Sequence, residues 1–264
     1  MGEGSQGSQH GESSDHRAAR VAMIGYGAEA REQALRLRAV GWHVAVVLRP
    51  GGMSWIRAVA DGFRPVLAPD AVEHADVVVV QLPEAEQPAM WACCIAPHLA
   101  DGALVVFAHG AALYSGAIEV DRRVDVVLVT GRDEPGATPT TPPSACRVAV
   151  HQDVTGRALE RAAGFARAAF GDPSVGTTTL AAEVETDLSE LVDRMGGVEA
   201  LLAEWDRVLA NPSHEPDEAT LRYYERLRET VVTGARSPAI SKPPSSRMRV
   251  DAPPRAGSRK RGAA

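Results

Sequence analysis

The sequence predicts an α/β protein in which a doubly wound parallel sheet is followed by a small all-helical domain. Short, almost wholly apolar segments alternate with helical patterns up to about residue 176, which is typical of strands buried on both faces. The first such segment, residues 20–24, leads into a glycine motif at 25–30. Beyond residue 177 the strand pattern stops and long helical patterns replace it.

The motif at 25–30 reads Gly-x-Gly-x-x-Ala. Gly25 permits a tight turn after the strand, Gly27 lets the backbone approach a phosphate, and Ala30 is small enough for close packing of a helix on the strand. The helix N-terminus then offers free N–H groups and a partial positive charge. We therefore predict a Rossmann-type sheet with a dinucleotide site at this turn, formed by Gly25, Tyr26, Gly27, Ala28 and Glu29.

The other elements follow from periodicity and from turn residues. A helix over 28–40 ends at Gly41, and strands are expected at 43–48, 64–67, 76–81, 104–107, 124–129 and 147–151. Short helices are expected at 55–61, 70–75 and 86–96, a loop at 131–147, and an alanine-rich helix at 156–170. Ligands sit at the carboxyl ends of such strands. His109, which follows strand 104–107, is therefore a candidate site residue, although a core histidine remains the alternative.

The chain divides into four predicted regions. Residues 1–18 are a disordered arm, and 19–176 are the dinucleotide-binding domain. Residues 177–235 form a small helical domain, in which Thr179 and its threonine neighbours can cap a helix over about 180–209 that breaks near Gly196 and Gly197. A second helix covers about 216–233. Residues 236–264 are a Pro- and Ser-containing tail with a basic end, which we interpret as solubilising disorder.

Bulk composition bounds the location and the partners. The net charge of −6 argues against a general nucleic-acid-binding protein. Cys93 and Cys94 are adjacent and Cys146 is isolated, so we expect buried thiols in a reducing compartment rather than a disulfide or a zinc site. No apolar run approaches the ~18 residues of a membrane span, and the N-terminus lacks a signal-peptide core. We expect a cytoplasmic protein with no membrane contact.

The loop at 49–55 follows the second strand and meets the adenosine ribose in a dinucleotide fold. An acidic residue in this loop would bind the 2′-hydroxyl of NAD, but the loop carries Arg49 and Ser54. A cation and a hydroxyl suit the 2′-phosphate of NADP. We therefore predict NADP(H), and the alternative is that Arg49 is a solvated loop cation. The strand at 76–81 also ends on the cofactor side, which adds Leu82, Pro83, Glu84 and Gln87 as candidate contacts.

Two carboxylate pairs lie in the helical region. Asp187 and Glu190 are three residues apart, and Glu225 and Glu229 are four apart, so each pair shares a helix face. Carboxylates so spaced on two facing helices can hold a hard cation such as Mg²⁺. Acidic helix positions are more often a solvated face, so both interpretations stay open at this point.

A set of short phrases adds a family resemblance. In order over residues 20–235 they are VAMIGYG (21–27), LR (48–49) with SW (54–55), ADGF (60–63), LP (82–83), IAP (95–97), FAHG (107–110), AVHQD (149–153) and ETDL (185–188). Together they resemble ketol-acid reductoisomerase, the NADPH- and Mg²⁺-dependent enzyme of branched-chain amino acid synthesis. The resemblance implies an alkyl shift within a 2-hydroxy-3-keto acid such as 2-acetolactate, followed by hydride reduction, with two Mg²⁺ ions polarising the substrate oxygens.

The resemblance also implies roles for individual residues. Asp187 and Glu190 fall on the first metal-ligand motif, and Glu225 and Glu229 on a second pair that meets the first between subunits, which implies a homodimer. His109 matches an active-site histidine. The remaining counterparts are Arg132 at a lysine position, Gly52 at a serine position of the phosphate loop, Gly136 at a later cofactor contact, and Ser241 as a remnant of a substrate-binding serine.

The sequence departs from the family pattern at several of these positions. Where the family has Gly-Tyr-Gly-Ser-Gln-Gly, this chain has Ala28, Glu29 and Ala30 in the last three places, so Glu29 repels a pyrophosphate unless it points away. Arg132 keeps a positive charge but cannot donate a proton near neutral pH. Glu190 follows Asp187 by three residues rather than four, and the last helical segment of the family is replaced by the tail.

Two functions of different class follow. The first is a ketol-acid reductoisomerase-like oxidoreductase acting on 2-acetolactate or a diverged analogue, and an ordinary NADP dehydrogenase without metal is a variant of it. The second is a non-catalytic NADP-binding relative that acts as a regulator or partner. The glycine turn supports the fold in both cases, while Glu29 and the shifted Glu190 favour the second.

Overall fold

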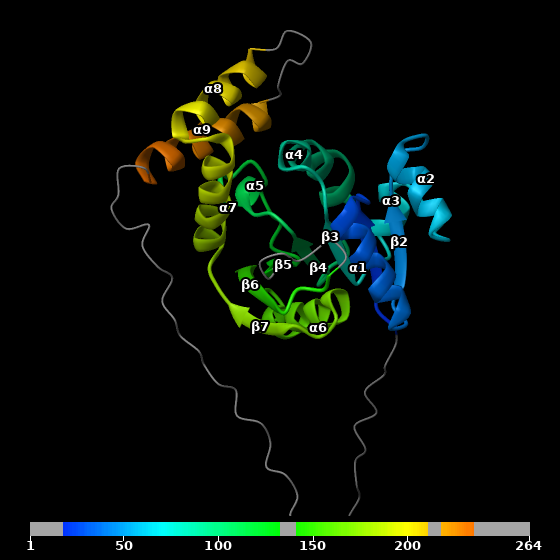
Figure 1. Cartoon of the computed structure of the whole chain (residues 1–264). Coiled ribbons are helices and arrows are strands. Elements are labelled where there is room, and N and C mark those ends of the chain that lie inside the picture. The colour runs from blue at the N-terminus through cyan, green and yellow to red at the C-terminus, as the bar shows by residue number, and fades with distance from the viewer. Residues whose placement is uncertain (1–17, 133–140, 211–217, 235–264) are drawn as a thin grey trace, which may run out of the picture.

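A seven-stranded sheet in the order β2-β1-β3-β4-β5-β6-β7 organises the computed structural model, which describes residues 18–132, 141–210 and 218–234 (Figure 1). The strands are β1 (Arg20–Ile24), β2 (His43–Val47), β3 (Val77–Val80), β4 (Leu104–Phe107), β5 (Asp125–Arg132), β6 (Ala145–Gln152) and β7 (Ser174–Thr177). All neighbouring pairs are parallel except β5 and β6. The predicted α/β class is confirmed, with one antiparallel pair inserted where β6 follows β5 without a described crossover helix.

The helices are α1 (Ala28–Ala39), α2 (Met53–Ala60), α3 (Ala68–Val72), α4 (Gln87–Met90), α5 (Ala111–Tyr114), α6 (Ala158–Phe170), α7 (Leu180–Met195), α8 (Val198–Leu209) and α9 (Glu218–Gly234). A 3₁₀ turn (Glu84–Glu86) precedes α4, and a π turn (Trp91–Ile95) and a 3₁₀ turn (Ala96–His98) follow it. Among the described residues, no helix is both long and apolar enough to cross a membrane.

The core lies on both faces of the sheet, because successive strand residues point to opposite sides. One face carries Val21, Met23, Val77 and Val79 against α1 and α6. The opposite face carries Ala22, Ile24, Val78 and Val80 against α3, the π turn, α5 and the helices α7–α9. Figure 1 shows α7–α9 gathered beside α5, away from α1 and α2. The helical region therefore shares a core with the sheet, and the predicted boundary at residue 177 stays a prediction.

The ends of α7 follow the sequence. The hydroxyl of Thr179 accepts a hydrogen bond from the backbone N–H of Ala182 at 3.2 Å, which satisfies one of the free donors at the helix start. Gly196 ends the helix in a left-handed conformation with φ 85°. The predicted break between the two helices is therefore confirmed.

Several expected elements were wrong. The strand expected at 64–67 is reduced to one bridge between Val66 and Val47. β7 and α5 were not predicted, since four residues are too few to show a periodicity.

Cys146 is a buried thiol as expected, but Cys93 and Cys94 form a disulfide with each other, and Cys93 is exposed. Adjacency in the sequence therefore does not keep these two sulfurs apart.

Candidate functional site

The turn between β1 and α1 is constrained at Gly25. Its φ is +101°, and a Cβ at this position would overlap the backbone carbonyl of Gln81 at the end of β3. Its N–H donates to the carbonyl of Val47 at 3.2 Å, which ties the turn to β2. Only glycine combines this φ with so close an approach to backbone. Gly25 therefore forms the tight turn after β1 that the glycine motif predicts.

Gly27 lies in open space. It is the N-cap of α1, no side chain caps its helix, and a Cβ built on it would meet nothing within 4 Å. The first N–H groups of α1 therefore face an uncovered approach, which is the arrangement that binds phosphate at helix N-termini. Ala30 is buried behind the turn, so α1 packs closely on the sheet.

The side chain of Tyr26 turns away from this approach. It is buried, its hydroxyl donates to a carboxylate oxygen of Asp61 at 2.9 Å, and its ring packs edge-on against Phe63. Burial and the Asp61 carboxylate raise the pKa of Tyr26 above its usual value. Arg31 also donates to Asp61, at 2.7 and 2.8 Å. The side chain of Tyr26 therefore joins the turn before α1 to the end of α2, and only its backbone lies at the cofactor turn.

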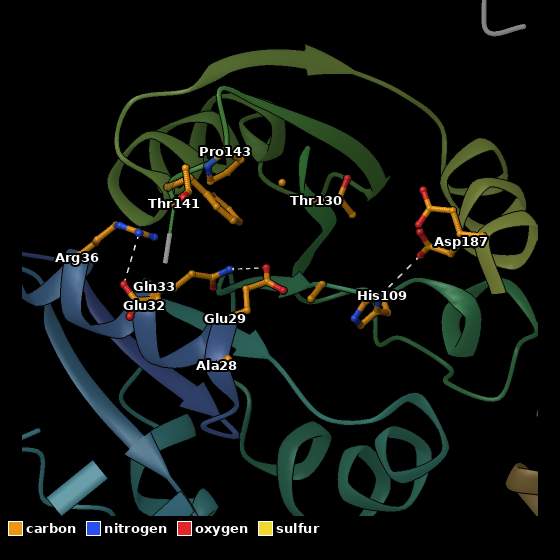
Figure 2. Close-up of a pocket in the computed structure, with 14 residues that line it drawn as sticks. Ala28, Glu29, Glu32, Gln33, Arg36, His109, Thr130, Thr141, Pro143 and Asp187 are labelled. Atoms are coloured by element: carbon orange, nitrogen blue, oxygen red, sulfur yellow. Dashed lines mark hydrogen bonds and ion pairs between the residues drawn. The ribbon is translucent and has the colours of Figure 1, made fainter. Parts of the chain in front are cut away.

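A pocket of about 430 Å³ opens beside α1, and Figure 2 shows the residues that line it. They come from α1, from the segment after β4, from β5 and the start of the segment before β6, and from α6 and α7. They are Ala28, Glu29, Glu32, Gln33, Arg36, Ala108, His109, Thr130, Gly131, Thr141, Pro143, Phe170, Asp187 and Glu190. The pocket lies at the carboxyl ends of β4 and β5, where doubly wound sheets bind ligands.

Glu29 faces this pocket. Its carboxylate accepts a hydrogen bond from the amide of Gln33 at 2.9 Å, and the amide of Gln81 in turn donates to Gln33 at 3.1 Å. Figure 2 shows the Glu29 side chain directed into the space between α1 and His109. Burial, with a smaller effect of the Glu29 charge, raises the pKa of Cys146 to about 12. Glu29 therefore lines the pocket instead of pointing away from it.

His109 and Asp187 meet across the pocket. Nδ1 of His109 lies 3.8 Å from Oδ2 of Asp187, and the two side chains are 53% and 36% exposed. Interaction with Asp187 raises the pKa of His109, burial opposes this effect, and the charges of Glu84 and Glu29 add to it. His109, which follows β4, therefore lies next to Asp187, the first predicted metal ligand.

A buried carboxylate positions α7. Glu183 is almost fully buried and accepts hydrogen bonds from the hydroxyl of Thr130 at 2.9 Å and from Arg147 at 3.3 Å. It lies one turn before Asp187, so these bonds fix that part of α7 against β5 and β6. Glu183 belongs to the same acidic stretch of sequence as Asp187 and Glu190, but its buried, positioning role was not predicted. The available signal was an acidic residue on the apolar side of α7, next to the core residue Val184 and between Leu180 and Leu188.

The loops that would border the adenosine are also placed. Arg49 follows β2, is 85% exposed, and lies 3.7 Å from Glu86. Gly52 is the N-cap of α2, and Ser54 is half-buried in its first turn. Leu82 is half-buried and Pro83 exposed.

Glu84 and Gln87 hold the loop after β3 in shape. Glu84 accepts from the N–H of Ala111 at 3.1 Å, at the start of α5. Gln87 is fully buried, and its amide donates to the carbonyl of Leu82 at 3.0 Å.

The carboxylate pairs do not converge within one chain. Asp187 and Glu190 line the same pocket, but Glu225 and Glu229 are exposed on α9 and do not line it. Within the described part of the chain, no three His, Cys, Asp or Glu side chains lie together as a metal site would need. Asp187 and Glu190 provide hard oxygen donors of the kind that Mg²⁺ prefers. Of the four carboxylates predicted to bind Mg²⁺, Asp187 and Glu190 are the two that line the pocket.

Comparison with known proteins decides the family. Residues 16–176 match the family described as acetohydroxy acid isomeroreductase, NADPH-binding domain. The chain belongs to this family. The NADP(+)-dependent ketol-acid reductoisomerase of Pyrobaculum islandicum is 41% identical over 217 residues, which cover 79% of this chain and 64% of that protein. The enzyme of the same name from Pyrobaculum neutrophilum is 42% identical over 217 residues, covering 79% of this chain and 65% of that protein.

A solved structure agrees with this assignment to the isomeroreductase family. It is an NADH-preferring ketol-acid reductoisomerase from an uncultured archean, with 26% identity, a TM-score of 0.59, and coverage of 82% of this chain and 68% of that chain. The resemblance predicted from short phrases is therefore confirmed. The chain spans less than two thirds of the length of the two Pyrobaculum relatives.

Three predicted isomeroreductase residues lie wholly or partly outside the described structure. Gly136 and Ser241 fall in undescribed segments. Arg132 is the last residue of β5, and its side chain is not described. The roles assigned to them stay predictions.

Proposed function

We propose that this chain is an NADPH-dependent ketol-acid reductoisomerase that acts on 2-acetolactate or a diverged analogue of it. The observation that carries the proposal is the meeting of His109 with Asp187 in a pocket that also contains the start of α1. The glycine turn supports a bound dinucleotide, and His109 and Asp187 supply an acid–base group and a metal-binding carboxylate next to it. The match to an NADPH-binding domain supports the cofactor.

In this proposal, different residues bind the cofactor, carry a proton and position the metal ligand. Gly25 and Gly27 would leave room for the pyrophosphate of the cofactor, and Arg49 and Ser54 would bind its 2′-phosphate. Interaction with Asp187 raises the pKa of His109, which makes the imidazole a better proton carrier than a free histidine would be. In this position His109 can donate a hydrogen bond or a proton to a substrate oxygen in the pocket. Glu183 keeps α7, and therefore Asp187, at a fixed distance from His109.

Mg²⁺ is part of the proposal. When bound, it would supply Lewis-acid polarisation of the substrate oxygens. Asp187 and Glu190 would hold it from α7, and Glu225 and Glu229 would reach it from α9 of a second copy, since they do not reach it within one chain. The active form is therefore proposed to be at least a homodimer, which sedimentation of the purified protein with and without Mg²⁺ would test.

A non-catalytic NADP-binding relative is the second candidate. Glu29 favours it, because its carboxylate, although exposed, lines the pocket. In this case the chain would bind NADPH and would not turn over a keto acid.

The deciding experiment follows NADPH oxidation with 2-acetolactate and Mg²⁺. We expect Mg²⁺-dependent oxidation by the wild type and at least a hundred-fold loss in Asp187→Ala. Asp193→Ala is the matched control, since Asp193 is an exposed carboxylate of the same helix that does not line the pocket. No oxidation by the wild type at saturating Mg²⁺ rejects the activity on this substrate. Calorimetry with NADPH then tests the second candidate, which requires binding.

A further inference from the structure

The loops after β2 and after β3 lie on either side of β1, because the sheet order is β2-β1-β3. The adenosine half of a dinucleotide lies over the carboxyl end of these strands. Arg49 follows β2, and Glu86 is the last residue of the 3₁₀ turn after β3. Nη2 of Arg49 lies 3.7 Å from Oε2 of Glu86. This ion pair therefore bridges the two loops across the adenosine side of the site.

In this pair, Glu86 binds Arg49, the cation that would bind the 2′-phosphate of the cofactor. Within residues 48–55, the loop that would receive the phosphate, Arg49 is the single charged residue. The side chains of Arg49 and Glu86 are 85% and 55% exposed, so their mutual attraction is that of a solvent-exposed pair. Such a pair is weak. A phosphate, with nearly two negative charges and several acceptor oxygens, can displace the carboxylate from the guanidinium.

We propose that Glu86 is a specificity-determining residue that competes with the 2′-phosphate of NADPH for Arg49. Its carboxylate occupies Arg49 in the free protein and repels the phosphate in the complex. NADH carries a hydroxyl in place of this phosphate and meets neither penalty. Glu86 therefore lowers the affinity for NADPH and leaves the affinity for NADH unchanged, so the ratio of the two affinities is smaller. The inference rests on the proposed use of NADP(H), but not on turnover.

Binding of NADPH and NADH to the full-length protein without substrate tests the inference. A carboxylate within a few ångström of a phosphate at a wet site changes affinity by about five-fold. We expect Glu86→Gln to bind NADPH about five-fold more tightly and to bind NADH within two-fold of the wild type. The gain should shrink in high salt, because the Debye length falls to about 3 Å at 1 M. Glu73→Gln is the control, since Glu73 is an exposed carboxylate that precedes β3, whereas the cofactor site follows the strands.

A double-mutant cycle locates the effect at Arg49. In an Arg49→Gln background, the gain in NADPH affinity from Glu86→Gln should be at most half as large. Unchanged NADPH affinity in Glu86→Gln overturns the inference, and so does an equal gain for both cofactors. Failure of the wild type to bind either cofactor overturns the inference together with the cofactor assignment. Binding of NADPH without turnover rejects only the catalytic proposal, and the affinities still decide the role of Glu86.

Discussion

Gly25 and Gly27 lie in the same turn, and we expect alanine at the two positions to have different effects. Gly25 has φ +101° and would bring a Cβ against the carbonyl of Gln81. Gly27 has φ −70°, which any residue adopts, and open space around it. Gly25→Ala should therefore damage the fold, whereas Gly27→Ala should damage phosphate binding and leave the fold intact.

The magnitudes follow from these two environments. At Gly25, a left-handed conformation costs a residue with a Cβ about 1–2 kcal/mol, and overlap with fixed backbone adds about 1–3 kcal/mol. The sum, about 2–5 kcal/mol, is a large part of a typical domain stability of about 5–15 kcal/mol. At Gly27, the loss of a good N-cap residue and the lower entropy of the unfolded chain nearly cancel, which leaves a change within about 1 kcal/mol.

Urea unfolding followed by circular dichroism measures the first effect, and NADPH titration by calorimetry measures the second. We expect Gly27→Ala to unfold like the wild type and to bind NADPH at least ten-fold more weakly, because its Cβ would meet the pyrophosphate. Wild-type NADPH affinity in Gly27→Ala would show that the pyrophosphate does not cross this turn. Wild-type stability in Gly25→Ala would refute the claim that the turn tolerates only glycine.

Three further predictions concern single carboxylates. Burial alone would raise the pKa of Asp125, but hydrogen bonds from Thr155, Val154 and Arg161 lower it. Asp125→Asn should cost about 2–4 kcal/mol at pH 7. This stability is present above the ordinary Asp pKa and is lost as the pH falls below about 4, which urea unfolding at several pH values measures. Glu183→Gln should cost about 1–2 kcal/mol in the same assay and lower kcat more than it raises the KM for NADPH. Glu29→Gln should raise NADPH affinity about five- to ten-fold by calorimetry, since it removes a charge near the pyrophosphate.

For each of these three substitutions, a different result would contradict the prediction. A stability gap between the wild type and Asp125→Asn that stays constant down to pH 3 would contradict the lowered pKa. Full activity in Glu183→Gln would show that α7 keeps Asp187 in place without this contact. Equal NADPH affinity in Glu29→Gln would place the pyrophosphate beyond the reach of this carboxylate. Glu73→Gln again serves as the charge-matched control for NADPH binding.

The elements that form from local patterns were predicted well. The strands that became β1–β4, the helix α1 and the break at Gly196 all follow from apolar runs, helical periodicity and glycine positions. The misses are elements of four residues or fewer, such as β7 and α5, and the antiparallel direction of β6. Such short elements form because neighbouring strands and helices hold them, and this information lies outside any short window of sequence.

The candidate site shows the same division. The sequence identified Asp187 and His109 separately, from helix spacing and from a strand end, and the fold placed them 3.8 Å apart. The role of Glu183 was not visible, because its partner Thr130 is 53 residues away in the sequence.

By itself, the sequence determined where the backbone must turn, which segments are buried strands, and which family the chain belongs to. Gly25 is the example, since a positive φ beside backbone admits one residue type. Tertiary structure alone decided where the charged side chains act. Glu29 faces the pocket because Gln33 and Gln81 hold it there, and Arg49 meets Glu86 because the sheet order places the loops after β2 and β3 on either side of β1. Backbone geometry is encoded over a few residues, whereas the direction of a charged side chain depends on partners that only the folded chain brings near.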